Sequence, residues 1–335
     1  MYDVLAGTYL VRCFVRSHDD LVRVFKITVV LIIPVSLAMA YERLYCYNFF
    51  SCMGGVPALS TLREGKIRAQ GPFLHSILAG TIGASCIPIS VCLWYLRNRT
   101  IAIAGIIAGT GMAYVANSSG AMLSFAFGII SLVLWPMRFR MRTVRYLMLA
   151  GIVLTDLSMK APIWWIFDKV SGIMGGTGYH RSMLIDAAVL HFKEWWLIGT
   201  TYTTHWMPYH PPSTPTMVDF TNHFLWEGVN GGLVTMILFL VIIVRAFREN
   251  GKALRLAAGV GRERELTVWA LGCCMVVHLA ASFSVAYFDQ TLSLWAMTLA
   301  FAGAMVDYYV GCTVVNETDP CAQGEVSDVR VEFAR

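Results

Sequence analysis

The sequence predicts an all-α, polytopic membrane protein: a helical bundle of about eight to nine spans with a large external loop that contains an amphipathic surface helix. Composition is the first indication, because 57% of the 335 residues are hydrophobic and only 14% are charged. A soluble domain carries about 25% charged residues. The second indication is a series of apolar runs long enough to cross about 30 Å of hydrocarbon as helices.

Eight apolar runs account for the predicted spans. They lie at residues 25–41, 76–96, 101–116, 121–136, 144–158, 222–244, 267–285 and 291–310. A ninth run, residues 2–15, is too short to cross a bilayer alone. Because it begins at the start of the chain, the chain is either truncated at its N-terminus or starts late. The run also lacks the basic segment and cleavage site of a signal peptide.

Basic residues predict the orientation, because short loops rich in Lys and Arg stay in the cytoplasm. If every run spans, one side holds Arg16, Arg23, Lys26, Arg97, Arg99, Arg138, Arg140, Arg142, Arg145, Arg245, Arg248, Lys252, Arg255, Arg262 and Arg264. The opposite side, the periplasm of a bacterial inner membrane, receives loops 41–75 and 159–222. We expect residues 1–310 to form one transmembrane domain and residues 311–335 a polar cytoplasmic tail. The net charge of +5 follows from this bias and implies no nucleic-acid partner.

The insert at residues 159–222 is the most unusual segment, because loops between spans are normally short. Within it, residues 178–196 predict a helix that lies flat on the outer surface, with its apolar face toward the bundle. Its apolar arc consists of Leu184, Ile185, Ala188, Val189, Phe192, Trp195 and Trp196. The polar residues outside that arc are Ser182, Asp186, Lys193 and Glu194.

Arg181 falls in the middle of the apolar arc when the helix is extended back one turn. A guanidinium aimed at a low-dielectric surface is costly unless an anion meets it. The planar fork of Arg matches phosphate oxygens, so a lipid-linked phosphate is the expected ligand. The alternative is a helix that begins after Arg181 and leaves it in water. Arg68 is the second candidate phosphate ligand, since the rigid turn at Gly71-Pro72 would hold it at the mouth of the bundle.

Six of the eight histidines fall on or near the external side. They are His75, His180, His191, His205, His210 and His223. Such a bias indicates either a site or the preference of amphipathic rings for the membrane interface. Cys46 and Cys52 share an external loop, which permits a disulfide. The chain has no CxxC or zinc-type spacing, so the sequence predicts no metal site.

Three blocks carry a resemblance to a known family. They are NSSGAMLSFAFGIISLVLW followed by RFRMR, then HRSMLIDAAVLHFKEWWLIGT, then TNHFLWEGVNGGLVTMILFL. Together they resemble the O-antigen ligase and O-antigen polymerase superfamily of bacterial membrane glycosyltransferases, over most of residues 60–310. The resemblance implies transfer of a glycan from undecaprenyl pyrophosphate to an acceptor hydroxyl at the periplasmic face. It implies no metal, no nucleotide sugar and no other cofactor.

The resemblance also suggests roles for individual residues. Arg181 matches the loop arginine of the family and Asn222 the asparagine before the last long span. With Arg68, they are expected to hold the pyrophosphate and stabilise charge on the leaving group.

The resemblance does not assign the catalytic base directly, because Thr221 stands where the family has a histidine. A loop histidine is expected to act as general base on the acceptor hydroxyl. His223, His180 and His191 are the candidates. Polymerases of the superfamily vary more at these positions than ligases do, so the resemblance favours a polysaccharide polymerase.

The leading hypothesis is therefore an enzyme of O-antigen or exopolysaccharide biosynthesis. Its partners would be the lipid-linked oligosaccharide, membrane lipids and other polysaccharide-assembly proteins. One alternative is a transporter or flippase of a lipid-linked glycan, which predicts broken helices or ionisable residues at the bilayer midplane. A second alternative is a non-catalytic membrane component of a polysaccharide export assembly.

Overall fold

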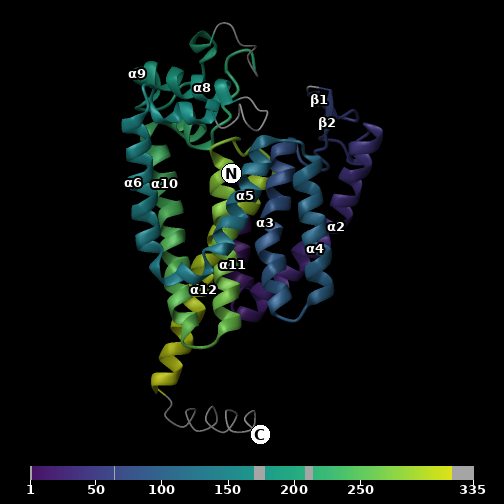
Figure 1. The fold of residues 1–335 in the computed structure, drawn as a ribbon, viewed down its shortest axis with the longest axis vertical. Coiled ribbons are helices and arrows are strands. Elements are labelled where there is room, and N and C mark those ends of the chain that lie inside the picture. Colours follow the sequence, from purple (N-terminus) through teal and green to yellow (C-terminus); the bar gives the residue numbers. More distant parts are fainter. Residues whose placement is uncertain (1, 64, 170–177, 208–213, 319–335) are drawn as a thin grey trace.

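The computed structural model describes residues 2–63, 65–169, 178–207 and 214–318, and most of them are helical (Figure 1). The longer helices are α1 Tyr2–Phe14, α2 His18–Tyr45, α3 Ser76–Tyr95, α4 Arg99–Val115, α5 Ser119–Val133, α6 Met141–Ser158, α10 His223–Ala258, α11 Arg262–Ser282 and α12 Gln290–Thr318. The shorter elements are η1 Phe49–Met53, η2 Trp135–Arg140, η3 Ile163–Trp165, α8 Gly178–Leu190, α9 Phe192–Trp195 and η4 Thr204–Trp206. The strands β1 Thr61–Arg63 and β2 Lys66–Arg68 pair as an antiparallel hairpin.

The predicted helical fold is confirmed, and each predicted apolar run overlaps one of the longer helices. Four of the described helices are long and apolar enough to cross a membrane: α2, α3, α10 and α11. The bent pair α5–α6 adds a fifth if it counts as one span, and α4 is apolar but shorter. The larger number of eight to nine spans stays a prediction. Cys46 and Cys52 are free thiols, so the disulfide that their loop permits is not formed.

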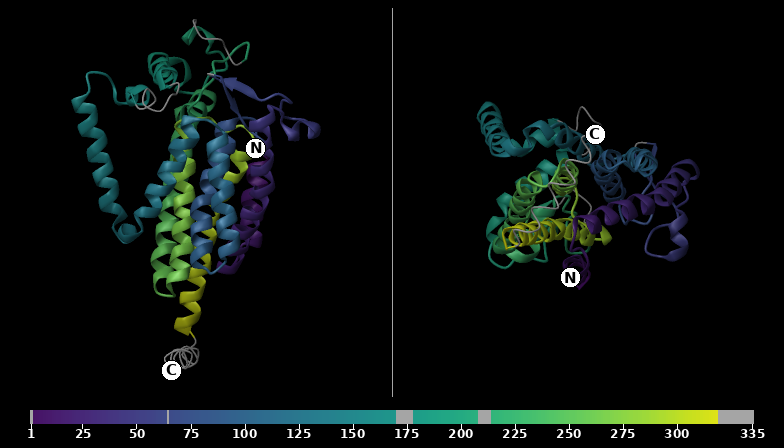
Figure 2. Two further views of the ribbon diagram at one scale, coloured as in Figure 1. Left: turned by 45° about the vertical axis from the view of Figure 1, so that its right-hand side comes forward. Right: turned by 90° about the horizontal axis from the view of Figure 1, so that it is seen from below.

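The break between α5 and α6 follows from local sequence. Pro136 lies in the first turn of η2, where it has no backbone N–H to continue the hydrogen bonds of α5. The axes on the two sides of this break differ by 80°. Arg138 fastens the bend to α11, because its Nε donates to Glu265 Oε2 at 2.8 Å. Beyond the bend, α6 stands apart from the bundle (Figure 2), and Val144 is its one buried residue.

Small residues bring the central helices close together. A Cβ added to Gly109 of α4 would lie 2.6 Å from the carbonyl oxygen of Gly83 in α3. A Cβ on Gly80 would lie 2.5 Å from the Cβ of Ala121 in α5. Such contacts let helix backbones approach closely in membranes, where packing rather than the hydrophobic effect drives association. The result is a core in which α3 and α11 are mostly buried, whereas only 22% of the most apolar stretch of α2 and of α10 is buried.

The long connections gather at one end of the bundle. Figure 1 shows the hairpin β1–β2 and helices α8 and α9 at this end, which we call the loop end. The α3–α4 and α10–α11 turns lie at the opposite end, as does the described end of α12. The described parts of loops 41–75 and 159–222 therefore share one end, although their assignment to the periplasm stays a prediction. Helix α12 continues to Thr318, past the predicted boundary at residue 311, and the division into a transmembrane domain and a cytoplasmic tail stays a prediction.

Helix α10 is broken near its start, at Gly232. This residue has φ 82° and ψ 172°, a conformation that is open essentially to glycine alone. The turn after α9 docks into the break through two backbone hydrogen bonds: Leu233 N–H donates to Trp196 O at 2.8 Å, and Thr200 N–H donates to Val229 O at 2.7 Å. The predicted single span at residues 222–244 is therefore two helical pieces held by the insert.

The predicted surface helix also differs from the structure. It is expected over residues 178–196, but α8 ends at Leu190 and α9 follows after a break at His191. Ser182, expected on the polar side, is fully buried, whereas Val189 from the apolar arc is 55% exposed. The reason is that α8 packs against the rest of the insert as well as against the bundle. The insert has a core of its own, made of Leu184, Ala187, Ala188, Trp195, Trp206, Met207, Val218, Phe220 and Val229.

Replacing Gly232 by Ala should destabilise the protein by about 3 kcal/mol or more, because the new methyl group would overlap the Leu197 carbonyl and strain the backbone. Gly251→Ala, in the regular part of the same helix, should stabilise it by up to about 1 kcal/mol. Thermal unfolding of the purified protein in detergent measures both. Equal stability of the two variants would contradict the assigned break.

Candidate functional site

Basic side chains from two separate loops lie within electrostatic range of one another at the loop end of the bundle. Arg63 lies in β1, Arg68 in β2, His75 caps α3, and Arg181 lies in α8. Arg63 and Arg68 are electrostatic neighbours of Arg181, and all three arginines act on His75. We call these four residues the arginine cluster. It joins the two loops that the sequence predicts on one side of the membrane.

The two arginines predicted to bind phosphate each have a buried side-chain nitrogen without a hydrogen-bond partner in the described part of the chain. Arg68 is 8% exposed. The Nε atoms of Arg68 and Arg181 are both buried and have no hydrogen-bond partner among the residues that the structure describes. In the described part of the chain, no carboxylate forms an ion pair with either arginine. A buried cation without a counter-charge is costly, so this arrangement favours an anionic ligand.

The last turn of α2 positions Arg68. The Glu42 side chain is fully buried and accepts hydrogen bonds from the backbone N–H groups of Gln70 and Gly71, at 3.1 and 2.8 Å. The same carboxylate accepts from Ser60 Oγ at 2.8 Å. Arg43 donates to the carbonyl of Ile67. Both sides of Arg68 are therefore fastened to α2.

Two tryptophans position Arg181 by holding α8. The indole N–H groups of Trp164 and Trp165 donate to the two carboxylate oxygens of Asp186, at 2.5 and 3.0 Å. Ser182 Oγ donates to the carbonyl of Trp164 at 3.0 Å. These contacts tie α8 to η3, and they explain why Asp186 and Ser182 lie at a contact instead of on a free polar face.

His75 contributes a donor to the cluster. Its Nδ1 accepts a hydrogen bond from Ile77 N–H at 3.1 Å, so the proton of the neutral ring lies on Nε2. Burial and the adjacent arginines Arg68, Arg181 and Arg63 lower its pKa to about 4. The ring is therefore neutral at pH 7 and offers Nε2–H as a hydrogen-bond donor.

The arginines remain charged in spite of their surroundings. Burial, reinforced by Arg63 and Arg68, lowers the pKa of Arg181 to about 10. Burial and Arg63 also lower the pKa of Arg68. Guanidinium groups with such pKa values stay protonated at pH 7. The cluster is thus a desolvated positive site whose strength toward an anion exceeds that of the same groups in water.

The remaining predicted site residues lie elsewhere. Asn222 caps α10, because its Oδ1 accepts from the backbone N–H groups of Phe224 and Leu225. His223 is fully buried and stacks on Tyr287 at 5.3 Å. Its Nδ1 accepts from the Tyr287 backbone N–H at 3.3 Å. The described contacts of these two residues include no member of the arginine cluster, so their predicted roles in catalysis and pyrophosphate binding stay predictions.

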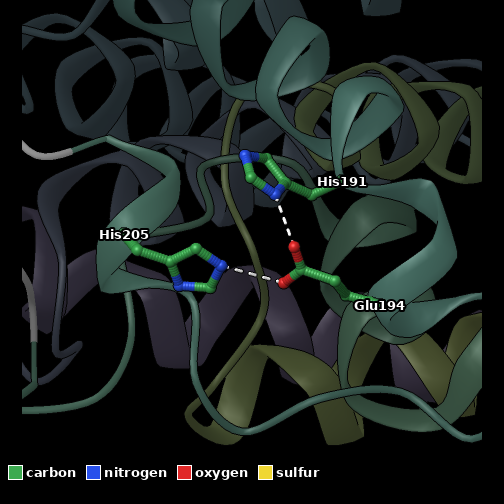
Figure 3. A group of neighbouring side chains, drawn as sticks. All are labelled: His191, Glu194 and His205. Atoms are coloured by element: carbon green, nitrogen blue, oxygen red, sulfur yellow. Dashed lines mark hydrogen bonds and ion pairs between the residues drawn. The ribbon is translucent and has the colours of Figure 1, made fainter.

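The other two candidate bases have different surroundings. His180 is partly exposed, directly precedes Arg181, and lies within electrostatic range of Asp219. His191 Nδ1 is 2.6 Å from Glu194 Oε1, and Glu194 Oε2 is 2.9 Å from His205 Nε2 (Figure 3). His191 thus belongs to a second group of titratable side chains, for which the sequence predicts no metal ligation.

Sequence reasoning left two residues of the site without a role. His75 appears there only as one of six external histidines, although it immediately precedes the apolar run 76–96, at the position of a helix cap. The sequence alone gives no role to Glu42. A carboxylate directly after the apolar run 25–41 is a signal, but its partners Gln70 and Gly71 are distant in the chain and become visible only in the fold.

Replacing Glu42 by Gln should destabilise the protein by about 2 to 3 kcal/mol, since one acceptor is lost and an amide N–H₂ faces buried N–H donors. Binding of an anionic ligand at Arg68 should weaken as well, because the segment that carries it loosens. Thermal unfolding and ligand titration test this. Glu263→Gln, at an exposed carboxylate of α11, is the control and should change neither property.

Acid should destabilise the protein in part through His75. Its pKa in the folded state, about 4, lies below the ordinary value of 6.5, so the unfolded chain binds more protons between these values. The stabilisation is complete above pH 6.5 and is lost as pH falls toward 4, by at most about 3 kcal/mol. His75→Asn keeps a capping side chain and should unfold with less pH dependence over this window. Identical pH profiles would rule out the assignment.

Neither the family models nor the curated proteins to which the chain was compared give a match. The chemistry of the arginine cluster is therefore inferred from its own charges, burial and hydrogen bonds. These describe a desolvated cationic site, built from two loops at one end of a bundle that contains helices of membrane-spanning length.

Proposed function

We propose that the chain is a membrane glycosyltransferase that uses an oligosaccharide linked to undecaprenyl pyrophosphate, and that it acts as a polysaccharide polymerase in preference to a ligase. One observation carries the proposal. Arg68 and Arg181, from different loops, lie within electrostatic range of each other, and neither buried Nε has a hydrogen-bond partner among the described residues. A diphosphate supplies an anion that two guanidinium forks can bind together.

The arginine cluster suits the charge that develops in such a transfer. The acceptor hydroxyl oxygen forms a bond to the anomeric carbon, and the bond from that carbon to the pyrophosphate oxygen breaks. The electron pair of the broken bond goes to the lipid pyrophosphate. Arg68, Arg181 and the Nε2–H of His75 would stabilise this negative charge, and burial strengthens their effect.

His180 is the general base that we favour among the three candidates. It is partly exposed and adjacent to Arg181 in the chain, and Asp219 lies within electrostatic range. His223 is fully buried among helices, and the described contacts of His191 are with Glu194, His205 and Trp206 and include no member of the arginine cluster. In this role His180 takes the proton of the acceptor hydroxyl as the new glycosidic bond forms.

The position of the charged groups favours transfer over transport. A transporter of this size would place broken helices and ionisable residues near the middle of its spans. The break in α10 at Gly232 lies near the middle of the predicted span at residues 222–244, a feature that keeps transport as a second candidate. The arginine cluster lies in loops and at helix ends. In the proposed orientation, the loop end faces the periplasm and the protein resides in the bacterial inner membrane.

Arg181→Ala should lower the rate of glycan transfer by about 100- to 1,000-fold, as expected when one preorganised donor to a developing anion is removed. Arg181→Lys keeps the charge but loses the planar fork, so its loss should be smaller. The assay uses the purified protein with lipid-linked oligosaccharide, together with glycan chain-length analysis in cells. Lys193→Ala removes one exposed cation from the same insert and is the control.

His180→Gln separates binding from chemistry in the same assay. It should reduce kcat by about 100-fold or more, the contribution of a general base, and leave lipid binding unchanged. Unchanged transfer by Arg181→Ala would overturn the proposed function. Tight lipid pyrophosphate binding without any transfer would favour a non-catalytic component instead.

A further inference from the structure

A second group of side chains in the insert has the composition of a metal site. One ring nitrogen each of His191 and His205 and a carboxylate oxygen of Glu194 all lie within 4.8 Å of one another. Figure 3 shows the two imidazole rings directed at the two oxygens of the same carboxylate, with separations of 2.6 and 2.9 Å. We call these three residues the His–Glu–His cluster.

The cluster is assembled on a fixed scaffold. His191 stands at the break between α8 and α9, Glu194 lies in α9, and His205 lies in η4. The buried side chain of Trp195 bridges the break, because its Nε1 donates to the carbonyl of Ala188 at 2.8 Å. The ligand atoms from separate elements are therefore already close together before any ion binds, which lowers the cost of ordering them.

Trp206 orients the carboxylate of the cluster. Its indole Nε1 donates to Glu194 Oε2 at 2.9 Å, and its ring stacks on His191 with centroids 5.2 Å apart. Tyr202 stacks on His205 at 5.1 Å. Metal-binding carboxylates and imidazoles characteristically have outer partners of this kind, which hold them in the ligating orientation.

We propose that the His–Glu–His cluster binds a zinc ion. Two imidazole nitrogens and one carboxylate oxygen are a ligand set that Zn²⁺ takes with tetrahedral geometry and one remaining position. The side chains of His191, Glu194 and His205 are 23%, 39% and 40% exposed, so water can fill that position. On binding, the ion replaces the protons that the imidazoles now share with Glu194.

The zinc ion would fasten η4 to α9. Without it, the polar contacts between these segments are hydrogen bonds from His205 and Trp206 to one exposed carboxylate, beside the stacked rings and the shared apolar core. The site is independent of the proposed glycosyl transfer, whose steps use the arginine cluster and His180. The spacing of the ligands, two residues and then ten, follows none of the zinc motifs sought in the sequence.

Zinc content of the purified full-length protein tests the proposal. The protein carries a purification tag without histidine, is stripped with chelator in detergent, and is dialysed against Zn²⁺ before elemental analysis. One zinc per chain is expected. Co²⁺ in place of Zn²⁺ should give the intense visible absorption of a four-coordinate site, and Zn²⁺ should raise the unfolding temperature.

Matched variants separate metal binding from hydrogen bonding. His205→Gln can still donate a hydrogen bond to Glu194 but should weaken zinc binding by more than about 100-fold. Trp206→Phe keeps the stacked ring, loses the indole N–H and should weaken zinc binding by about 10- to 100-fold. Lys193→Ala, between the ligands, should keep full zinc content.

The outcomes decide the proposal without reference to glycan transfer. Wild-type protein that binds less than stoichiometric zinc overturns it. Equal zinc content in the wild type and in folded His205→Gln also overturns it. If His205→Gln does not fold, Glu194→Gln takes its place, because it keeps the acceptor and loses the charged ligand. Loss of zinc by either folded variant supports the site, whatever the effect of Arg181→Ala on transfer.

Discussion

The backbone contact between the insert and the break in α10 is the constraint on which the rest of the loop end depends. Gly232 opens α10, and Trp196 O and Thr200 N–H take up hydrogen bonds that a continuous helix would make internally. Gly199 matches Gly232, since a Cβ on it would lie 2.6 Å from the carbonyl oxygen of Asn230. Two side-chain-free backbones therefore meet, and the contact anchors the core of the insert to the bundle.

The arginine cluster depends on that anchor and on a second one. Arg181 reaches the cluster because α8 belongs to the docked insert, and Arg68 reaches it because Glu42 holds the adjoining backbone. Neither arginine would leave water spontaneously, because desolvating a guanidinium is unfavourable. The packing of the surrounding fold offsets this unfavourable desolvation free energy, and an anionic ligand would reduce it on binding. The same surroundings keep His75 neutral, so that it donates instead of adding a further positive charge.

Much of the fold could be predicted from the sequence, because each apolar run is a local property of the chain. The runs overlap the longer helices, and the two long loops share one end. The surface helix shows where local reasoning ends. Periodicity placed Ser182 on a polar face, but its hydroxyl meets the Trp164 carbonyl, which periodicity cannot reveal. Arg68 and Arg181 can be named from the sequence, and their phosphate-binding role stays a proposal, whereas His75 and Glu42 acquire their places beside them only through contacts between separate elements.

The sequence by itself determined which residues prefer hydrocarbon, where basic residues interrupt them, and which arginines lie outside the apolar runs. Those features depend on transfer free energies of single residues and on their spacing. The tertiary structure alone decided that Arg68 and Arg181 lie within electrostatic range of each other with no ion-paired carboxylate among the described residues, that α10 breaks at Gly232, and that His191 and His205 face one Glu194. Each of these is a relation between distant segments, and it exists only once packing has set their positions.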